Sequence, residues 1–171
     1  MQSLFDILGL APSFTLNLKT LEQAYFAAQR ATHPDRFVGK PEAQRVAAIG
    51  RSQLVNDAYE TLKNPLTRAE HLLELQGIAA LADDGRAPPA VLEEMMDLRE
   101  RIFDHGADGA ALAQMVEEIK TLAAQNTVAL TEAFTAADYA RATLETIRLQ
   151  YLGKAMEEAH MLIYRLKASH G

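Results

Sequence analysis

Residues 30–41 read RATHPDRFVGKP, and the proline inside this stretch decides how the first part of the chain folds. Proline fixes its own backbone φ, donates no backbone hydrogen bond and disfavours helical geometry in the residue before it. A helix that precedes Pro34 therefore has to end near Thr32. His33 and Asp35 then lie in a short loop between two helices rather than inside a helix.

The segments on both sides of this loop have helical periodicity. The segment 18–32, with Asn17 as its expected N-cap, has one apolar face, made of Leu18, Leu21, Tyr25 and Ala28. The segment 41–63 has another, made of Ala47, Leu54, Val55, Ala58 and Leu62. Two antiparallel helices joined by the loop can bury these faces against each other, so we expect a helical hairpin.

Short helices are predicted on both sides of the hairpin. Ser3 and Asp6 suggest a capping box for a short N-terminal helix. A helix from Leu66 to Gln76 follows Asn64-Pro65 and is stopped by Gly77. Residues 77–89, GIAALADDGRAPP, contain turn and breaker signals and are expected to be a linker.

Three longer helices are predicted after the linker. The first spans about 90–105 and the second about 108–134. The third starts after Thr135, which suggests a capping box with Asp138, and reaches about Lys167. The last helix has an apolar stripe made of Leu144, Ile147, Tyr151, Ala155, Leu162 and Leu166. No segment has the pattern of a strand. We therefore expect an all-α fold with a hairpin domain over residues 1–76, a linker over 77–89 and a three-helix bundle over 90–171.

Composition excludes several kinds of site. The chain has no cysteine, which rules out disulfides, thiolate metal ligands and thiol catalysis. Its five histidines are scattered without metal-ligand spacing, and it has no glycine-rich phosphate loop. His33 and Asp35 could act as a base and its orienter, but the sequence places no nucleophile near them. We therefore expect no enzymatic activity, no metal and no cofactor.

The net charge of −6 lies in the second half of the chain. Residues 1–76 hold eight Lys/Arg and eight Asp/Glu, whereas residues 77–171 hold nine and fifteen. This distribution lacks the basic footprint of a nucleic-acid-binding protein. The N-terminus has no basic region of a signal peptide, and no apolar run approaches the roughly 20 residues of a membrane span. These features favour a protein that binds other proteins.

The loop and its flanking helices resemble the J domain of DnaJ-type co-chaperones. His33-Pro34-Asp35 is followed by Arg36-Phe37, and the next helix carries Val55-Asn56-Asp57-Ala58-Tyr59. Residues 64–73, NPLTRAEHLL, resemble the Pro-Leu-x-Arg-Ala-Glu-(aromatic)-Leu-Leu signature of the HscB family of iron–sulfur co-chaperones. Residues 92–100, LEEMMDLRE, resemble a motif of that family's C-terminal domain. The resemblance covers essentially the whole chain and implies a J domain followed by a three-helix bundle in an L shape.

The resemblance implies a chaperone as the first partner. In J proteins the His-Pro-Asp loop contacts the ATP-bound state of a heat-shock chaperone and accelerates ATP hydrolysis. The residues expected to contact an HscA-type chaperone here are His33, Pro34, Asp35, Arg30, Arg36 and Lys40. The segment 18–32 has only Lys19 and Arg30 as basic residues, so we expect little electrostatic steering.

The resemblance implies the cluster-assembly scaffold IscU as the second partner. In the family it binds an apolar–acidic face on the first helix of the bundle, together with an aromatic–leucine pair on the third. The matching residues are Leu92, Met96, Asp97, Glu100, Asp104, Tyr151 and Leu152. Leu92, Met96 and Glu100 recur at i, i+4 and i+8 and are expected to share a face. Bundle core is the alternative for Leu92, Met96 and Tyr151.

The expected function is that of a co-chaperone that brings the scaffold to the chaperone, stimulates its ATPase activity and thereby aids iron–sulfur cluster assembly and transfer. We expect Arg68 and Glu70 to fix the J domain against the bundle. The expected location is the bacterial cytoplasm. Two alternatives stay open: a general J protein with another client, and, more remotely, a small helical enzyme.

Overall fold

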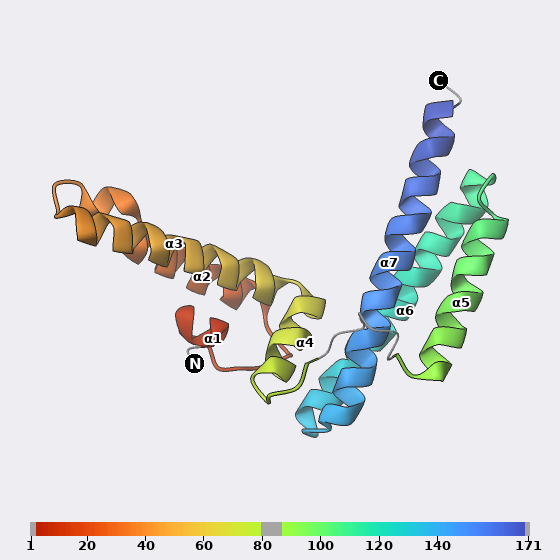
Figure 1. Cartoon of the computed structure of the whole chain (residues 1–171), viewed down its shortest axis with the longest axis horizontal. Coiled ribbons are helices and arrows are strands. Elements are labelled where there is room, and N and C mark those ends of the chain that lie inside the picture. Colours follow the sequence, from red (N-terminus) through yellow and green to blue (C-terminus); the bar gives the residue numbers. More distant parts are fainter. Residues whose placement is uncertain (1–2, 80–86, 170–171) are drawn as a thin grey trace. The chain divides into compact units, whose positions relative to one another are not determined.

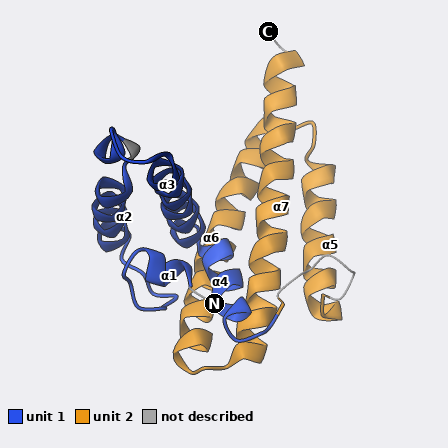
Figure 2. Ribbon diagram, turned by 60° about the vertical axis from the view of Figure 1, so that its left-hand side comes forward, with its two compact units in different colours: residues 1–78 blue, residues 79–171 orange. Residues whose placement is uncertain are grey.

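The chain forms only helices, turns and loops in the part that the computed structural model describes, residues 3–79 and 87–169. It divides into two compact units, residues 1–78 and 79–171 (Figures 1 and 2). Each unit has buried apolar residues of its own. The all-α fold class is confirmed, and the L shape expected for the whole chain stays a prediction.

Unit 1 contains four α-helices and a short 3₁₀ helix among its described residues. They are α1 (Leu4–Ile7), α2 (Leu18–Thr32), the 3₁₀ helix η1 (Pro34–Phe37), α3 (Glu42–Lys63) and α4 (Pro65–Glu74). The expected caps are confirmed. Ser3 and Asp6 form a capping box at α1, and the side chain of Asn17 accepts the first free backbone N–H groups of α2.

Helices α2 and α3 form a hairpin (Figure 1). Its buried side chains form part of the core of unit 1, together with Phe5, Phe14, Ala69 and Leu73. The buried side chains of the hairpin are Leu21 from α2 and Ala48, Val55, Ala58 and Leu62 from α3. Tyr25 stacks on Tyr59 with 4.3 Å between ring centroids. The hydroxyl of Tyr25 also donates a hydrogen bond of 3.1 Å to Asn56 Oδ1. Aromatic and aliphatic side chains thus join the two helices along their length.

Three residues of the expected inner faces lie outside the core. Leu18 is 57% exposed and Leu54 is 51% exposed, and Ala47 is exposed as well. Successive residues of an α-helix are rotated by about 100°. The face of α3 that contacts α2 runs through Ala48 and Val55, which leaves Ala47 and Leu54 at its edge. Leu18 is the first residue of α2, so no preceding turn covers it.

Helix α4 fastens the N-terminal part of unit 1. Arg68 is buried, donates from Nη1 to the carbonyl oxygen of Phe14 at 3.0 Å and lies 5.3 Å from the centre of its ring. Burial lowers the pKa of the Arg68 guanidinium. His71 Nε2 accepts the backbone N–H of Leu4 at 3.1 Å. The Arg68 contacts lie within unit 1, and the expectation that Arg68 and Glu70 fix the J domain against the bundle stays a prediction.

Unit 2 is a bundle of three described helices. They are α5 (Pro89–Asp104), α6 (Gly109–Thr135) and α7 (Tyr139–Ser169). Helices α6 and α7 form a long antiparallel hairpin, and α5 lies beside α7 and runs in the same direction (Figure 1). The core is formed mainly by Val91, Met95, Leu98, Ile102, Leu112, Met115, Val116, Ile119, Ile147, Leu152, Ala155 and Ala159. The expected linker, 77–89, includes residues 80–86, which lie outside the described residues.

The turn between α6 and α7 differs from its expected form. Asp138 Oδ1 accepts the backbone N–H of Arg141 at 3.0 Å, so Asp138 itself caps α7. Thr135 is the last residue of α6, and its hydroxyl donates to the carbonyl oxygen of Thr131 at 2.7 Å. Ala137 adopts a left-handed φ of 53° between the two helices. The capping box expected for Thr135 and Asp138 is wrong, because α6 continues through Thr135 and α7 begins later.

Candidate functional site

The His-Pro-Asp loop is closed by contacts of its own residues. His33 leaves helical geometry with φ −58° and ψ 129°, and η1 begins at Pro34. The backbone N–H of Asp35 donates to His33 Nδ1 at 3.3 Å, and a carboxylate oxygen of Asp35 lies 3.6 Å from the same nitrogen. The His33 and Asp35 side chains are nevertheless 51% and 86% exposed. The loop therefore presents both groups to solvent on a locally ordered turn.

Basic side chains lie at the base of this loop. Arg36 Nη1 donates to the carbonyl oxygen of Arg30 at 3.2 Å, which covers one of the carbonyls that the end of α2 leaves without a helical partner. Gly39, at a φ of 81°, turns the chain before α3, and Lys40 follows it. Arg30, Arg36 and Lys40 are exposed. None of the three forms an ion pair with another described residue.

Helix α5 exposes a row of apolar side chains, Leu92, Met96 and Phe103, which we call the apolar row. Met96 is 70% exposed and Phe103 is 81% exposed. Leu92 is partly buried and packs against the core. The three residues recur at i, i+4 and i+11, which places them on one side of the helix. Phe103 was not among the expected site residues, although its position seven residues after Met96 is a signal for it.

Next to the apolar row, α5 carries four exposed carboxylates, the acidic row, consisting of Glu93, Asp97, Glu100 and Asp104. They recur at i, i+4, i+7 and i+11 and so form a continuous line along the helix. In the described part of the chain none of them forms an ion pair. Glu100 was expected on the face of Leu92. It lies about 80° around the helix from Leu92, in the acidic row.

Tyr151 on α7 borders the apolar row. Arg99 of α5 donates from Nε to Glu158 of α7 at 3.0 Å. Leu92 precedes Arg99 by seven residues on α5, and Tyr151 precedes Glu158 by seven residues on α7. Because the two helices run in the same direction, Leu92 and Tyr151 lie at about the same height along the bundle. Tyr151 is partly buried against the core, and the ammonium of Lys154 lies 5.4 Å from the centre of its ring.

Leu152 does not belong to the exposed face. It is 1% exposed and lies in the core of the bundle. Neighbouring residues of a helix point about 100° apart, so Tyr151 and Leu152 do not both face the same surface. We therefore remove Leu152 from the expected contact residues and assign it a packing role.

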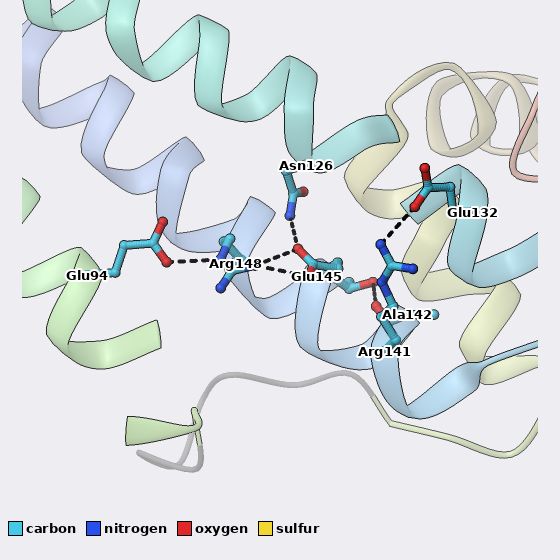
Figure 3. A network of polar contacts seen from close by, with 8 residues as sticks. Glu94, Asn126, Glu132, Arg141, Ala142, Glu145 and Arg148 are labelled. Carbon is cyan, nitrogen blue, oxygen red and sulfur yellow. Dashed lines mark hydrogen bonds and ion pairs between the residues drawn. The ribbon is translucent and has the colours of Figure 1, made fainter. Parts of the chain in front are cut away.

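A polar network around the buried side chains of Glu145 and Asn126 ties the three helices of unit 2 together (Figure 3). Arg148 on α7 donates from Nε to Glu94 of α5 at 3.0 Å and from Nη1 to both carboxylate oxygens of Glu145 at 3.0 and 2.8 Å. Asn126 of α6 donates to Glu145 at 2.7 Å. Burial lowers the pKa of Arg148, but the hydrogen bonds and charges of Glu145 and Glu94 outweigh it and raise that pKa overall. The network helps to hold α5 in place.

The His-Pro-Asp loop and the face of α5 formed by the apolar and acidic rows are both exposed surfaces. Among residues 3–79 and 87–169, no group of three or more His, Cys, Asp or Glu side chains is arranged to hold a metal ion. The same part of the chain contains no helix long and apolar enough to cross a membrane.

A helical hairpin with a His-Pro-Asp loop between its helices places the chain in the class of J-domain co-chaperones. Comparisons with known proteins agree. The family model of the HSCB C-terminal oligomerisation domain matches residues 87–160. The co-chaperone protein HscB of Proteus mirabilis is 36% identical over 172 residues, which cover 95% of this chain and 96% of that protein. The chain therefore belongs to the HscB family of co-chaperones.

Solved structures show the same relationship. The chaperone HscB from Vibrio cholerae matches with a TM-score of 0.83 and 30% identity, covering 96% of this chain and 99% of that chain. The human co-chaperone protein HscB matches with a TM-score of 0.87 and 26% identity, covering 94% of this chain and 82% of that chain. These relatives are named as chaperones or co-chaperones and not as enzymes.

Proposed function

We propose that this chain brings an iron–sulfur cluster scaffold of the IscU type to a heat-shock chaperone of the HscA type and stimulates the ATPase activity of that chaperone. Its activity would be to connect two proteins and to trigger hydrolysis in one of them. The observation that carries the proposal is the pairing of two exposed surfaces in one chain: an ordered His33–Asp35 loop in unit 1, and an apolar row beside an acidic row in unit 2.

The loop supports the chaperone-stimulating part. A partner that binds an already ordered turn loses less conformational freedom than one that has to order a flexible segment. Asp35 offers a carboxylate that is 86% exposed, and His33 offers an imidazole beside it. Arg30, Arg36 and Lys40 add positive charge near the loop and are free of ion pairs with other described residues. We propose that these residues, with Pro34, form the chaperone contact.

The α5 face supports the scaffold-binding part. Apolar anchors bordered by carboxylates suit a partner that has an apolar patch with basic residues at its edge. Met96 is the exposed anchor, and Leu92 and Tyr151 lie about one helical turn before it. Asp97, Glu100 and Asp104 supply the charge. Residues 77–171 hold fifteen acidic and nine basic residues, and this excess of negative charge also favours a partner with basic residues.

The assignment of functions to segments is part of the proposal. Residues 1–76 would form the chaperone-stimulating domain, residues 77–89 the linker and residues 90–171 the scaffold-binding domain. We place the protein in the bacterial cytoplasm, in line with the bacterial relatives it resembles. The chain would bind neither ATP nor the cluster itself.

The proposal is tested by the ATPase rate of an HscA-type chaperone, with and without scaffold. The wild-type chain should raise the rate, and raise it further when scaffold is present. Asp35→Ala should reduce the stimulation about tenfold or more, because it removes the exposed carboxylate of the loop. Scaffold affinity, measured by titration calorimetry, should stay unchanged in this variant.

Asp57→Ala is the matched control. Asp57 is also an exposed aspartate of unit 1, but it lies about 22 Å along α3 from the loop end of that helix. It should stimulate like the wild type. Full stimulation by Asp35→Ala would show that the loop is wrongly assigned. Normal stimulation without any scaffold binding would favour a general J protein with another client.

A further inference from the structure

Phe103 is an aromatic side chain that does not take part in the core packing of unit 2. It is 81% exposed at the C-terminal end of α5, the highest exposure among the large apolar side chains of the described residues. The core face of α5 is completed by other residues, namely Val91, Met95, Leu98 and Ile102. Exposure of a phenylalanine ring forgoes the gain from burying its surface, so this position is unfavourable for the chain alone.

The apolar row extends the face of α5 toward Phe103. From Leu92 to Phe103 the row covers 11 helical steps, or about 16 Å along the helix axis. Without Phe103 it would end at Met96 after about 6 Å. Arg99 stands between Met96 and Phe103 on the same side, and its guanidinium is paired with Glu158 at 3.0 Å. The positive charge of Arg99 within the apolar row is therefore balanced by the carboxylate of Glu158 on α7.

The acidic row limits what can cover this face. It follows the apolar row over its whole length and ends at Asp104, next to Phe103. A second copy of this chain laid on the face would bring two acidic rows close together, and like charges at an interface oppose binding. A partner with basic residues beside an apolar patch fits both rows. Stable protein interfaces bury about 800 Å² on each partner, and inclusion of Phe103 lengthens the apolar part of this face from about 6 Å to about 16 Å along the helix.

We infer that Phe103 is a second apolar anchor for the same scaffold protein, and that it enters a separate apolar pocket beyond the one that receives Met96. Seven helical steps separate the two anchors, so the two pockets lie about 10 Å apart on the scaffold. Aromatic residues are enriched among the side chains that dominate interface affinity. This inference rests on the proposed scaffold-binding function and assigns a specific residue to it.

The first test is a calorimetric titration of the scaffold with the full-length chain and its variants. Phe103→Ala should weaken binding about tenfold, with a thermal unfolding curve like that of the wild type because the ring is exposed. Tyr164→Ala is the matched control. It also removes an exposed aromatic ring, 73% exposed on α7, and should bind like the wild type.

The outcomes separate this inference from the proposed function. If Met96→Ala weakens binding and Phe103→Ala does not, Phe103 is no anchor although the scaffold-binding function stands. If the wild-type chain does not bind the scaffold at all, the function fails and the inference fails with it.

A photoreactive benzoylphenylalanine placed at position 103 is the second test. It should crosslink to the scaffold, and excess wild-type chain should compete the crosslink away. Crosslinking to a second copy of the chain in place of the scaffold would overturn the inference.

Discussion

The two proposed contact surfaces differ in what holds them in shape. The His-Pro-Asp loop is ordered by contacts between residues that are close in sequence, such as Asp35 to His33 and Arg36 to Arg30. The face of α5 is ordered from outside, because α5 is attached to α7 and α6 through side chains far away in sequence. The loop is therefore a local structure, and the face is a product of tertiary packing.

This difference predicts how each surface responds to substitution. A small, locally ordered loop depends on the few groups it presents, so a single exposed side chain can remove its effect. A helix face spreads its affinity over several residues, so single exposed changes weaken it in steps. The face should in addition be sensitive to buried residues that it does not expose, because they hold α5 in place.

The largest effect is expected for Arg148→Ala. Glu145 is 7% exposed, and removal of Arg148 leaves its carboxylate buried without its cation. The Arg148 side chain is 27% exposed and Asn126 still donates to Glu145, so the expected loss is about 1–3 kcal/mol. Amide hydrogen exchange in residues 89–104 should accelerate, and scaffold affinity should fall. Stimulation of the chaperone in the absence of scaffold should be retained, because the loop is ordered locally.

Arg141→Ala is the control for this prediction (Figure 3). Arg141 also lies on α7 and donates to Glu132 at 2.8 Å, but the two side chains are 44% and 59% exposed. Exposed pairs contribute about 0–1 kcal/mol, so hydrogen exchange in α5 should not change. Equal effects of the two variants would show that the network around Glu145 does not hold α5.

An intermediate effect is expected when the acidic row is neutralised. The double variant Asp97→Asn/Glu100→Gln keeps the side-chain shapes and removes two charges. Association with the scaffold should become about three- to tenfold slower at low salt, with little change in dissociation, because rim charges act mainly on the association rate. The difference from the wild type should shrink at high salt. Stopped-flow kinetics at several salt concentrations measures this.

The matched control places the same charge change in unit 1. Asp57→Asn/Glu60→Gln removes two exposed charges from α3 and should leave association with the scaffold nearly unchanged. Equal slowing by both double variants would mean that total charge, and not the acidic row, governs the encounter.

The same contrast explains which parts could be predicted from sequence. The end of α2 at Thr32 and the caps at Ser3 and Asn17 depend on neighbouring residues, and the structure confirms them. The rotation of a helix against its partners depends on distant residues. This is why Leu54 was expected inside but lies outside.

In the candidate site, too, expectations that depend on neighbouring residues were correct and those that depend on distant residues were not. Helical spacing alone grouped Leu92 with Met96, and the structure places them on one side of α5. Spacing did not reveal that Leu152 is in the core or that Phe103 is exposed, because both depend on how α5 and α7 pack against each other. Arg148 was also missed. A lone arginine in a helix gives no sign that two carboxylates from different helices surround it.

The smallest effect is expected for Glu118→Gln, which loosens the other end of α5. Arg101 of α5 donates to both carboxylate oxygens of Glu118 on α6, at 2.8 and 2.6 Å. The pKa of Glu118 is lowered, chiefly by the hydrogen bond from Arg101. Both side chains are about half exposed, so solvent screens the pair and the variant should lose only about 0.5 kcal/mol of stability at pH 7.

The pH dependence of that loss identifies its origin. Because the folded state lowers the pKa of Glu118, its contribution is present above the ordinary glutamate pKa of about 4.3 and disappears as the pH falls through the lower folded value. The stability difference between wild type and Glu118→Gln should therefore shrink at acidic pH. Glu117→Gln is the control, because Glu117 pairs with Lys120 on the same helix and does not reach α5. Faster hydrogen exchange in α5 for Glu118→Gln alone would show that even an exposed pair helps to hold the face of α5. Identical exchange in both variants would show that this pair does not hold α5, and that the network around Glu145 and the core do.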